Sequence, residues 1–463
     1  MPWSIASNCP KALRIAPNRP IDRLAPYHTL LNVMVSLPRI ILRDHKADAV
    51  RRFHPWIFSG AIKRIEPEAQ EGDWVEVYSD RGEFLAAGFF GTGSIAVKVV
   101  SFQPVESLDA LFLQRFQQAY ALRKQLGLAA GGFRRDCFVN RPDAKPDAKP
   151  DATSHANPNA NPNPTNCYRL INSEGDGLPG LIVDWYHGVA VVLTYSLGMA
   201  QQRDRIVECL KTLYGSDLRA VYDKSAAVLH GGKSQPTNQY LFGEANLGEK
   251  RLGEVLENGH RFAVDWEEGQ KTGFFLDQRD NRQLLSQHVA GKKVLNTFCY
   301  SGGFSVYALQ AGAAVVHSVD SSAKAIAWTE QNVSLNPATP GTHQSYTADV
   351  FNFLKDCDDD YDVIILDPPA FAKSLSARHQ ATLAYRRLNY LALLKIRPGG
   401  LIFTFSCSQV VSLDNFKGAV TAGAIDAGRP VRLLGHLSQP ADHPTSLYHP
   451  EGQYLKGLVL EAG

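Results

Sequence analysis

The sequence predicts an α/β protein whose C-terminal half forms a doubly wound parallel sheet. Four short apolar runs, "KVLNTF", "AVVHSVD", "YDVIILD" and "GLIFTFS", alternate with helical segments from Gly248 onward. Continuous apolar runs of this length are typical of strands that are buried on both faces of a parallel sheet. A β-rich region and a mixed α+β region precede this half, so the 463 residues are expected to form several domains.

The first domain is expected at residues 37–105 as a small β-barrel. Its short apolar runs, "DWVEVYSD", "FLAAGFFG" and "IAVKVVSF", are separated by Gly and Asp, which is typical of several short strands joined by turns. Residues 1–36 are rich in proline and poor in acidic residues. We interpret them as a disordered tail, or as the result of a start codon assigned too early, with Met34 as the true start.

A central α+β domain is expected at residues 106–247. It opens with an amphipathic helix at 108–128, and a second helix is expected near 199–214. Between them, residues 141–165 form a Pro/Asn/Asp/Ala repeat that contains no apolar side chain larger than alanine. Such a segment cannot bury a core, so we predict a disordered insertion. The α/β domain then spans 248–463.

Composition excludes several classes of protein. The seven cysteines are scattered and contain no C-x-x-C pair, which argues against a disulfide framework and against a structural zinc site. We therefore expect reduced thiols, a cytoplasmic location and no bound metal. The chain contains no apolar run long enough to span a membrane. A net charge of +2 is compatible with RNA binding but does not require it.

Polar residues follow several of the predicted strands, at the edge where open α/β sheets bind ligands. A Ser-Gly-Gly turn at Gly302 and Gly303 follows the first strand, and glycine lets a backbone approach a ligand closely. Asp320 ends the second strand, 24 residues after Asn296, where an acid can meet ribose hydroxyls. A cap on the helix that starts at Ser322 is an equal alternative for Asp320.

The last two predicted strands end in residues that suit covalent chemistry. Asp367 precedes the stiff Pro368-Pro369 turn, and Cys407 follows the fifth strand. From its local sequence alone, Cys407 is better interpreted as a buried core residue. If the two strands are neighbours, however, acid and thiol converge beside the cofactor. A thiolate can then add to C6 of a pyrimidine and make C5 nucleophilic toward a methyl group, while the acid holds the N3/N4 edge.

Seven ordered motifs across 37–463, outside the insertion, resemble the RlmI-like family of S-adenosylmethionine-dependent 23S ribosomal RNA (cytosine-C5) methyltransferases. They are "HPWIFSGAI", "NSEGDGLPGLIVD", "GQKTGFFLDQRDNR", "NTFCYSGGFSVYA", "DPPAFAKS", "FSCS" and "DHPTSLYHPEGQYLKGL". The resemblance implies an RNA-binding PUA barrel, a central domain and a class I, Rossmann-like methyltransferase domain. It further implies S-adenosyl-L-methionine as cofactor and ribosomal RNA as partner, with base flipping. The oligomeric state is open, with a homodimer among the options.

The resemblance also implies roles for individual residues. Cys407 would be the nucleophile and Asp367 would hold the cytosine edge. The expected donor-binding set is Asn296, Phe298, Tyr300, Ser301, Gly302, Gly303, Asp320, Ser321, Asp349 and Asp367. Asp349 would meet the adenine amino group. The residues expected next to substrate or cofactor are Phe275, Asp277, Gln278, Arg279, Pro368, Pro369 and Lys373.

The sequence departs from the family pattern at two places, and other functions compete. Ala370 stands where many RNA 5-methylcytosine enzymes carry a second cysteine, and Phe405 stands where relatives often have another. The group that removes the C5 proton is therefore unassigned. A guanine-N7 or other base methyltransferase is the main alternative, although such enzymes tend to have Asn in place of Cys407. A non-catalytic RNA-binding assembly factor would not need the acids, and an NAD-dependent oxidoreductase would need a glycine fingerprint that is missing.

Overall fold

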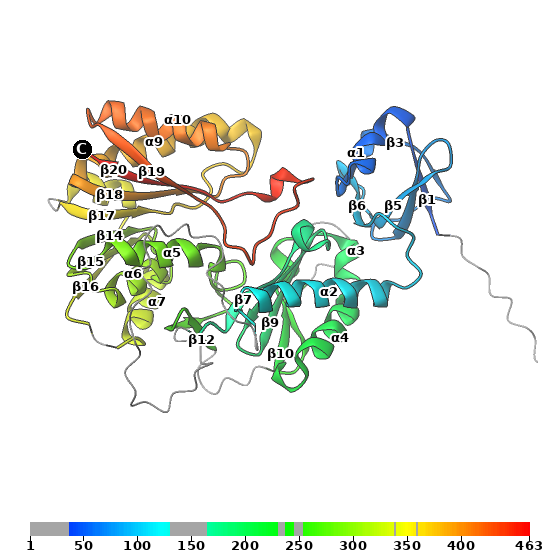
Figure 1. Ribbon diagram of the computed structural model, residues 1–463, viewed down its shortest axis with the longest axis horizontal. Coiled ribbons are helices and arrows are strands. Elements are labelled where there is room, and N and C mark those ends of the chain that lie inside the picture. Colours follow the sequence, from blue (N-terminus) through cyan, green and yellow to red (C-terminus); the bar gives the residue numbers. More distant parts are fainter. Residues whose placement is uncertain (1–36, 130–163, 230–236, 245–252, 338, 358–359) are drawn as a thin grey trace, which may run out of the picture. The chain divides into compact units, whose positions relative to one another are not determined.

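The computed structural model describes residues 37–129, 164–229, 237–244, 253–337, 339–357 and 360–463 (Figure 1). The predictions for the tail 1–36 and for most of the 141–165 insertion therefore lie outside the described residues. Residues 37–463 make up one compact unit by their internal contacts. Within it, three larger sheets follow one another along the chain.

The first sheet contains the β-rich region that the sequence predicts. Its six strands are ordered β2-β6-β5-β4-β1-β3, and the three apolar runs of the sequence form β4, β5 and β6. Side chains along β4 alternate between buried and partly exposed, so one face of this sheet packs on a core. The strands are β1 (Arg39–Leu42), β2 (Trp56–Phe58), β3 (Ile62–Glu66), β4 (Trp74–Tyr78), β5 (Phe84–Phe90) and β6 (Ile95–Ser101), with the short helix α1 (Asp48–Arg51).

The central sheet has five strands in the order β11-β10-β9-β8-β7, and it confirms the α+β prediction. Helix α2 (Leu108–Gln125) begins at Ser107, whose hydroxyl accepts a hydrogen bond from the Ala110 N–H at 3.3 Å. Its apolar side packs into a core with the strands. The other elements are β7 (Cys167–Asn172), β8 (Leu181–Tyr186), β9 (Val189–Thr194), α3 (Leu197–Ala200), α4 (Arg203–Tyr214), β10 (Ala220–Asp223) and β11 (Gln239–Phe242).

The end of the predicted insertion requires a correction. The Gly259 N–H donates to the Pro164 carbonyl at 2.9 Å, and the Asn258 N–H donates to the Thr165 hydroxyl at 2.9 Å. Both donors belong to the turn between β12 (Gly253–Glu257) and β13 (His260–Val264). Pro164 and Thr165 thus pair with the folded chain, contrary to the prediction that all of 141–165 is unpacked, because this turn offers backbone donors that need partners.

The C-terminal domain contains the predicted doubly wound sheet, in the order β16-β15-β14-β17-β18-β20-β19. Strands β14 to β18 run parallel, and β20 is antiparallel to both β18 and β19. The chain builds outward in both directions from β14, which makes the end of β14 the topological switch point. The strands are β14 (Lys293–Thr297), β15 (Val315–Asp320), β16 (Thr342–Thr347), β17 (Tyr361–Leu366), β18 (Ile396–Ser406), β19 (Val431–Leu437) and β20 (Lys456–Ala462).

Both faces of this sheet are covered by helices (Figure 1). Along β17, Ile364 and Leu366 pack in the core on the α9 and α10 side, whereas Val363 and Ile365 pack on the α5 and α6 side. This alternation explains the continuous apolar run that predicted the strand. The helices are α5 (Arg279–Leu285), α6 (Gly303–Gln310), α7 (Ala323–Ser334), α8 (Val350–Asp356), α9 (Arg378–Lys395) and α10 (Leu413–Asp426).

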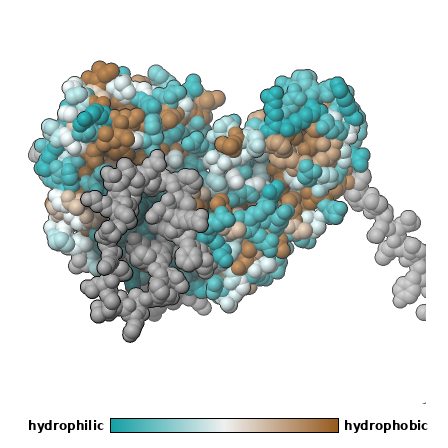
Figure 2. All heavy atoms as spheres, viewed as in Figure 1, coloured by the Kyte–Doolittle hydropathy of each residue, from teal (hydrophilic) through white to brown (hydrophobic). Residues whose placement is uncertain are grey.

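The surface in Figure 2 mixes hydrophilic residues with scattered hydrophobic ones over the α9 and α10 region. Ile425 on α10 and Leu434 on β19 are exposed apolar side chains. Single exposed apolar residues are normal on folded proteins, so the oligomeric state stays open. Among the described residues, no helix has both the length and the apolar character that crossing a membrane would require.

Candidate active site

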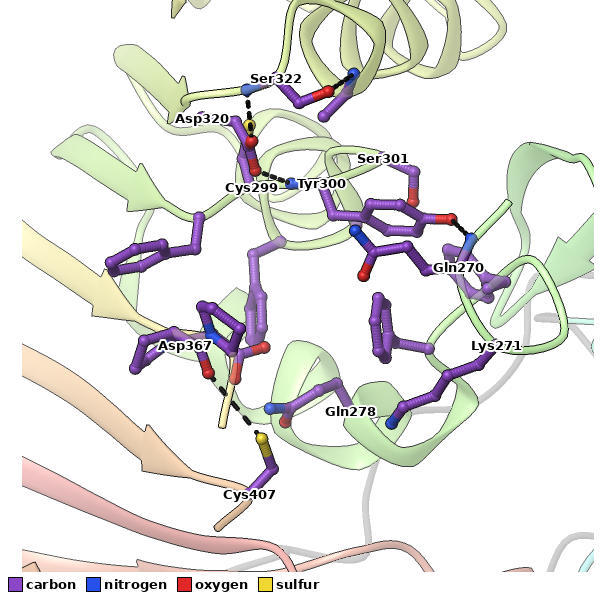
Figure 3. Close-up of a pocket in the computed structure, with 18 of the residues that line it drawn as sticks. Gln270, Lys271, Gln278, Cys299, Tyr300, Ser301, Asp320, Ser322, Asp367 and Cys407 are labelled. Carbon is purple, nitrogen blue, oxygen red and sulfur yellow. Dashed lines mark hydrogen bonds between the residues drawn. The ribbon is translucent and has the colours of Figure 1, made fainter. Parts of the chain in front are cut away.

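A pocket of about 680 Å³ lies at the carboxyl ends of β14, β15, β17 and β18 (Figure 3). This size falls in the range of small-molecule sites. The structure brings together there most of the residues that the sequence predicts. They are Phe275, Asp277, Gln278, Asn296, Phe298, Tyr300, Ser301, Gly303, Asp320, Ser321, Asp367, Pro368, Pro369, Lys373 and Cys407.

The turn from β14 into α6 forms one wall of the pocket and is held in an unusual backbone conformation. Phe298 and Tyr300 both have positive φ, at 52° and 49°. The carboxylate of Asp320 accepts hydrogen bonds from the Tyr300 N–H at 3.1 Å and the Ser322 N–H at 2.9 Å. From α7, Asn332 donates to the Ser301 carbonyl at 2.8 Å. Asp320 therefore ends β15 and fixes the turn, whereas α7 is capped by Ser322, whose hydroxyl accepts a hydrogen bond from the Ala325 N–H at 3.3 Å. The predicted role of Asp320 toward ribose hydroxyls stays a prediction.

Packing against a neighbouring helix is enough to require glycine at position 302. Gly302 has a φ of +75° and does not line the pocket. A Cβ atom at this position would lie 2.7 Å from Cγ2 of Thr329 on α7. The missing side chain of Gly302 thus makes room for α7, and its predicted contact with the methyl donor stays a prediction.

Asp349 occupies a different place from the other predicted donor-binding residues. It is exposed, is not part of the pocket lining, and caps α8 by accepting a hydrogen bond from the Asn352 N–H at 2.9 Å. A capping carboxylate at this position has a sufficient structural reason. Its predicted role toward the adenine amino group stays a prediction.

Asp367, at the end of β17, is a carboxyl group with a strongly shifted titration. Exclusion of water by the surrounding protein raises the pKa of Asp367 to about 7, and the nearby charge of Asp277 acts in the same direction. Gln278 opposes this shift through a hydrogen bond to the carboxyl group. The Gln278 amide is oriented by Asn281, whose Nδ2 donates to the Gln278 Oε1 at 2.6 Å. The Gln278 NH₂ group is thereby directed toward Asp367.

The pKa of Asp277 is shifted in the opposite direction to that of Asp367, although both residues line the same pocket. Its burial opposes ionisation, but Lys271, His443 and a hydrogen bond from Tyr454 outweigh that effect and lower the pKa of Asp277 to about 2. The Tyr454 hydroxyl donates to the Asp277 Oδ2 at 2.6 Å. Two carboxyl groups with separated pKa values provide one proton donor and one fixed negative charge near neutral pH.

Cys407 lies beside Asp367 because β17 and β18 pair directly, with Leu366 opposite Thr404. The Cys407 Sγ is 3.9 Å from the Pro368 carbonyl oxygen, toward which its thiol donates (Figure 3). Burial raises the pKa of Cys407 to about 11, and Asp367 adds to this shift while Lys271 opposes it. The thiol is consequently neutral at rest and needs a nearby positive charge to ionise.

The two serines around Cys407 shape its turn. The hydroxyl of Tyr385 on α9 lies 2.9 Å from the Ser406 hydroxyl and 3.1 Å from the Ser408 hydroxyl. On the same side, the buried ammonium of Lys456 donates to the Ser408 carbonyl at 2.9 Å. These contacts hold the backbone on both sides of the thiol and leave Cys407 directed toward the pocket.

Arg279, like Gly302 and Asp349, is a predicted site residue that does not line the pocket. It is buried and donates to the Asp442 carboxylate at 2.7 Å, with Glu257 3.6 Å away. It therefore ties the segment before the sheet to the loop that follows β19. The family resemblance implied a place next to substrate or cofactor for Arg279 together with Asp277 and Gln278, and the last two do line the pocket.

Comparison with known proteins assigns the fold to a family. Residues 169–439 match the model of an S-adenosylmethionine-dependent methyltransferase family, and residues 40–102 match a PUA-like domain. Ribosomal RNA large subunit methyltransferase I of Aeromonas hydrophila is 36% identical over 91% of this chain and 99% of its own length. The chain belongs to this RlmI-like family. The Escherichia coli member is also 36% identical, over 91% of this chain and 98% of its own length.

Solved structures agree with the RlmI-like fold. A SAM-dependent methyltransferase from Streptococcus mutans superposes with a TM-score of 0.72 at 24% identity, covering 91% of this chain and 99% of that one. A methyltransferase complexed with SAH superposes with a TM-score of 0.73 at 24% identity, with the same coverage of both chains. The predicted fold class and the predicted methyl donor of the family are thus confirmed.

The pocket of this RlmI-like chain fits S-adenosylmethionine. The rings of Phe275, Tyr300 and Trp328 form a contiguous aromatic wall, with centroids 5.0 Å and 5.5 Å apart in succession. Asp320 uses two of its acceptor positions on backbone N–H groups, and a carboxylate has about four, which leaves room for ribose hydroxyls. Among the described residues, no group of three or more His, Cys, Asp or Glu side chains is arranged to hold a metal ion.

Sequence reasoning missed several residues of the site. Lys271, Trp328, Leu455 and Glu268 line the pocket, and Tyr454 contacts it through Asp277. Lys271 and Leu455 lie within quoted motifs, "GQKTGFFLDQRDNR" and "DHPTSLYHPEGQYLKGL", which was the available signal. Trp328 lies in the middle of α7 and had no signal, because only the packing of α7 beside the β14–α6 turn brings its ring to the pocket.

Proposed function

We propose that the protein transfers a methyl group from S-adenosylmethionine to C5 of a cytosine in 23S ribosomal RNA, through a covalent adduct with Cys407, in the cytoplasm. One observation carries this proposal: the thiol of Cys407 and the carboxyl group of Asp367 meet in the same pocket that fits the methyl donor. The relatives named as large-subunit rRNA methyltransferases support RNA as the substrate.

The thiol of Cys407 supplies the nucleophile that cytosine chemistry needs. C5 of cytosine is unreactive toward a methyl group until a nucleophile adds at C6. When the Cys407 thiolate forms the S–C6 bond, the electrons of the C5=C6 bond become available at C5. The donor, when bound, supplies an electrophilic methyl group and leaves as the neutral thioether.

Asp367 supplies the matching proton. A carboxyl group whose pKa is raised to about 7 is largely protonated at slightly acidic pH and half protonated near neutrality. It can donate its proton to N3 of the cytosine as the thiolate adds, which neutralises the charge that develops on the ring. Gln278, held by Asn281, keeps the carboxyl group oriented.

Loss of the C5 proton then releases the methylated base from Cys407. After C5 gains the methyl group, its hydrogen leaves as a proton to a base, and the C5–H electrons re-form the C5=C6 bond. The S–C6 bond breaks and Cys407 leaves as thiolate, while the N3 proton returns to Asp367. The base that takes the C5 proton is not assigned among the pocket residues.

The target base must leave its stack to reach this chemistry. Both Cys407 and Asp367 lie at strand ends inside a pocket, and a stacked base in a helix cannot reach the thiol there. Extrusion of the nucleotide would bring its pyrimidine edge to Asp367. This requirement favours a single-stranded or loosely paired segment of RNA as the target.

A trapping experiment tests the proposal. Enzyme and S-adenosylmethionine are incubated with RNA that carries 5-fluorocytosine, in which the C5 fluorine cannot leave and the adduct accumulates. Wild-type enzyme is expected to form an adduct that survives denaturation, with the RNA on Cys407 by peptide mass spectrometry. Cys407→Ala is expected to form none. Cys357→Ala is the matched control, because Cys357 is a partly buried thiol outside the pocket.

Adduct formation by Cys407→Ala would show that the nucleophile is misassigned. If unmodified RNA instead gained a methyl group on a guanine, detected after digestion to nucleosides, the cytosine proposal as a whole would be wrong. A second independent comparison is the 5-methylcytosine content of ribosomal RNA from cells with and without this gene.

A further inference from the structure

We propose that Lys271 is the residue whose positive charge stabilises the thiolate of Cys407. The inference rests on the proposed function and deepens it, because it identifies the group that makes the nucleophile competent. Lys271 lines the pocket together with Cys407, Asp367 and Asp277. No histidine lines this pocket, so a cysteine–histidine pair is not formed among the described residues.

The backbone at Lys271 is held in a conformation that lysine does not favour. Its φ is +50°, in the left-handed region where glycine and asparagine are commonest. Strain of this kind persists only where the neighbouring structure enforces it, and it is concentrated at functional sites. The left-handed conformation of Lys271 therefore marks this position as a candidate functional residue.

Both neighbours of Lys271 are fixed by hydrogen bonds. On one side, the Gln270 N–H donates to the Tyr300 hydroxyl at 2.9 Å. On the other side, the buried Thr272 hydroxyl donates to the Asp184 carboxylate at 2.6 Å and lies 3.0 Å from the Tyr186 hydroxyl. These contacts pin the segment between the central sheet and the β14–α6 turn, so that the side chain of Lys271 projects into the pocket (Figure 3).

The ammonium group of Lys271 is itself positioned by aromatic rings. It lies 4.7 Å from the ring centroid of Phe275 and 5.9 Å from that of Tyr454. The Asp277 Oδ2 is 3.8 Å away. Cation–π contacts and one carboxylate hold the charge at a defined place, although half of the side chain is exposed to solvent. Lys373, another exposed lysine at the same pocket, has no cation–π contact among the described residues, unlike Lys324, which lies over the Trp328 ring.

The charges that face Cys407 explain why a cation is needed there. Asp367 from the end of β17 and Asp277 from the segment before α5 both disfavour the thiolate, as does burial. Tyr385 lies behind the turn, and Lys456 approaches from β20, where its ammonium is bound to the Ser408 carbonyl. Arg282, Lys324 and Lys373 also line the pocket, but Lys271 is the lining cation whose charge lowers the pKa of Cys407 against the two acids. The positive charge of Lys271 therefore stabilises the thiolate, which is the form of Cys407 that attacks the base.

The fraction of Cys407 that is present as thiolate can be measured without RNA, from its rate of alkylation. Iodoacetamide reacts with the Cys407 thiolate to form a thioether and release iodide, and the thiol proton goes to water. The reaction rate at a fixed pH below the thiol pKa is proportional to the thiolate fraction. Alkylation of Cys407 is followed by peptide mass spectrometry in folded enzyme without methyl donor, which separates it from the other cysteines.

Lys271→Asn is the informative variant, because asparagine accepts the left-handed backbone and removes the charge. We expect Cys407 in this variant to be alkylated about tenfold more slowly at about pH 8.5, which corresponds to a thiol pKa raised by about one unit. Lys271→Arg should restore most of the rate. Lys373→Met is the matched control, and its Cys407 should react at the wild-type rate.

Two results would overturn the inference. One is a wild-type alkylation rate in Lys271→Asn. A raised KM for RNA with an unchanged thiol would then show that Lys271 binds substrate phosphate. The other is an equal loss of alkylation rate in Lys373→Met, which would mean that the summed charge of the pocket, and not Lys271 in particular, determines the thiolate fraction of Cys407.

Thermal melting checks that each variant is folded, and Lys271→Met provides a second neutral side chain. Because the assay contains no RNA, it is independent of the choice of target base.

Discussion

The Cys407 Sγ lies 3.9 Å from the carbonyl oxygen of Pro368, the residue that follows Asp367. The thiol therefore contacts the backbone of the Asp-Pro-Pro turn, and the two ionisable groups are held beside each other by paired strands. Because the charge of Asp367 raises the pKa of Cys407, the two titrations are coupled. The pH behaviour of the enzyme should report the pair rather than either residue alone.

We first predict an activity profile with an acid limb near pH 7. The reactive form needs Cys407 as thiolate and Asp367 protonated, although the pKa of Cys407 is raised to about 11 and that of Asp367 to about 7. The concentration of this reverse-protonated form rises with pH up to about 7 and then stays level to about 11. Values of kcat/KM measured across this range should rise and then reach a plateau. A profile that falls above pH 7 would contradict the assignment.

Two variants should change the acid limb of the kcat/KM profile, one by shifting it and the other by removing the break near pH 7. In Asp277→Asn the carboxylate that helps to raise the pKa of Asp367 is gone, so the limb should shift to lower pH. Asn still offers an acceptor to the Tyr454 hydroxyl. In Asp367→Asn the carboxyl group that gives the break near pH 7 is gone, so the remaining activity should rise with pH without a break at that point.

Our second prediction concerns stability. Because the pKa of Asp367 is about 7 in the folded protein and near 4 when unfolded, ionising this carboxyl group costs folding free energy. The cost is absent below about pH 4, where both states are protonated, and is complete above about pH 7. Asp367→Asn removes the cost and keeps an acceptor for Gln278. Its melting temperature should exceed that of wild type at pH 8 but not at pH 4, as scanning calorimetry would reveal.

The sequence predicted the parts of the site that follow local rules. Asp320, Asp367 and Cys407 are found at strand ends because each apolar run forms a buried strand and the polar residue after it falls at the sheet edge. Neighbouring strand pairing then brings Asp367 and Cys407 together without any further assumption. The doubly wound fold followed from the same runs.

The sequence could not predict which residues of a motif enter the pocket. Arg279 and Asp277 stand two positions apart, yet one pairs with Asp442 and the other lines the pocket. Their directions depend on the loop 438–449, which is distant in sequence. The strained conformation of Lys271 is equally hidden, since contacts with Asp184 and Tyr300 enforce it through its neighbours. Such positions are set by tertiary contacts, not by periodicity.

The third prediction tests the structural role of Arg279. Its guanidinium is buried against Asp442 at 2.7 Å, so removing the charge leaves a buried carboxylate without its main counter-charge. Arg279→Met should lower the free energy of unfolding by about 3–5 kcal/mol, measured by urea denaturation. Arg432→Met breaks an exposed ion pair with Glu461 and should cost less than about 1 kcal/mol. Equal small losses of unfolding free energy in both variants would show that the buried pair stabilises the fold no more than the exposed pair does.

The fourth prediction separates capping from cofactor binding at Asp349. Asparagine caps helices about as well as aspartate, so Asp349→Asn should keep α8 intact and the melting temperature unchanged. Because Asp349 does not line the pocket, we expect the Kd for S-adenosylmethionine, measured by calorimetry, to stay within about twofold of wild type. Asp320→Asn, at the pocket, should weaken binding about tenfold or more, because a carboxylate accepts stronger hydrogen bonds than an amide. Weakening of the same size in Asp349→Asn, with α8 still stable, would instead show that its carboxylate reaches the adenine when the donor binds.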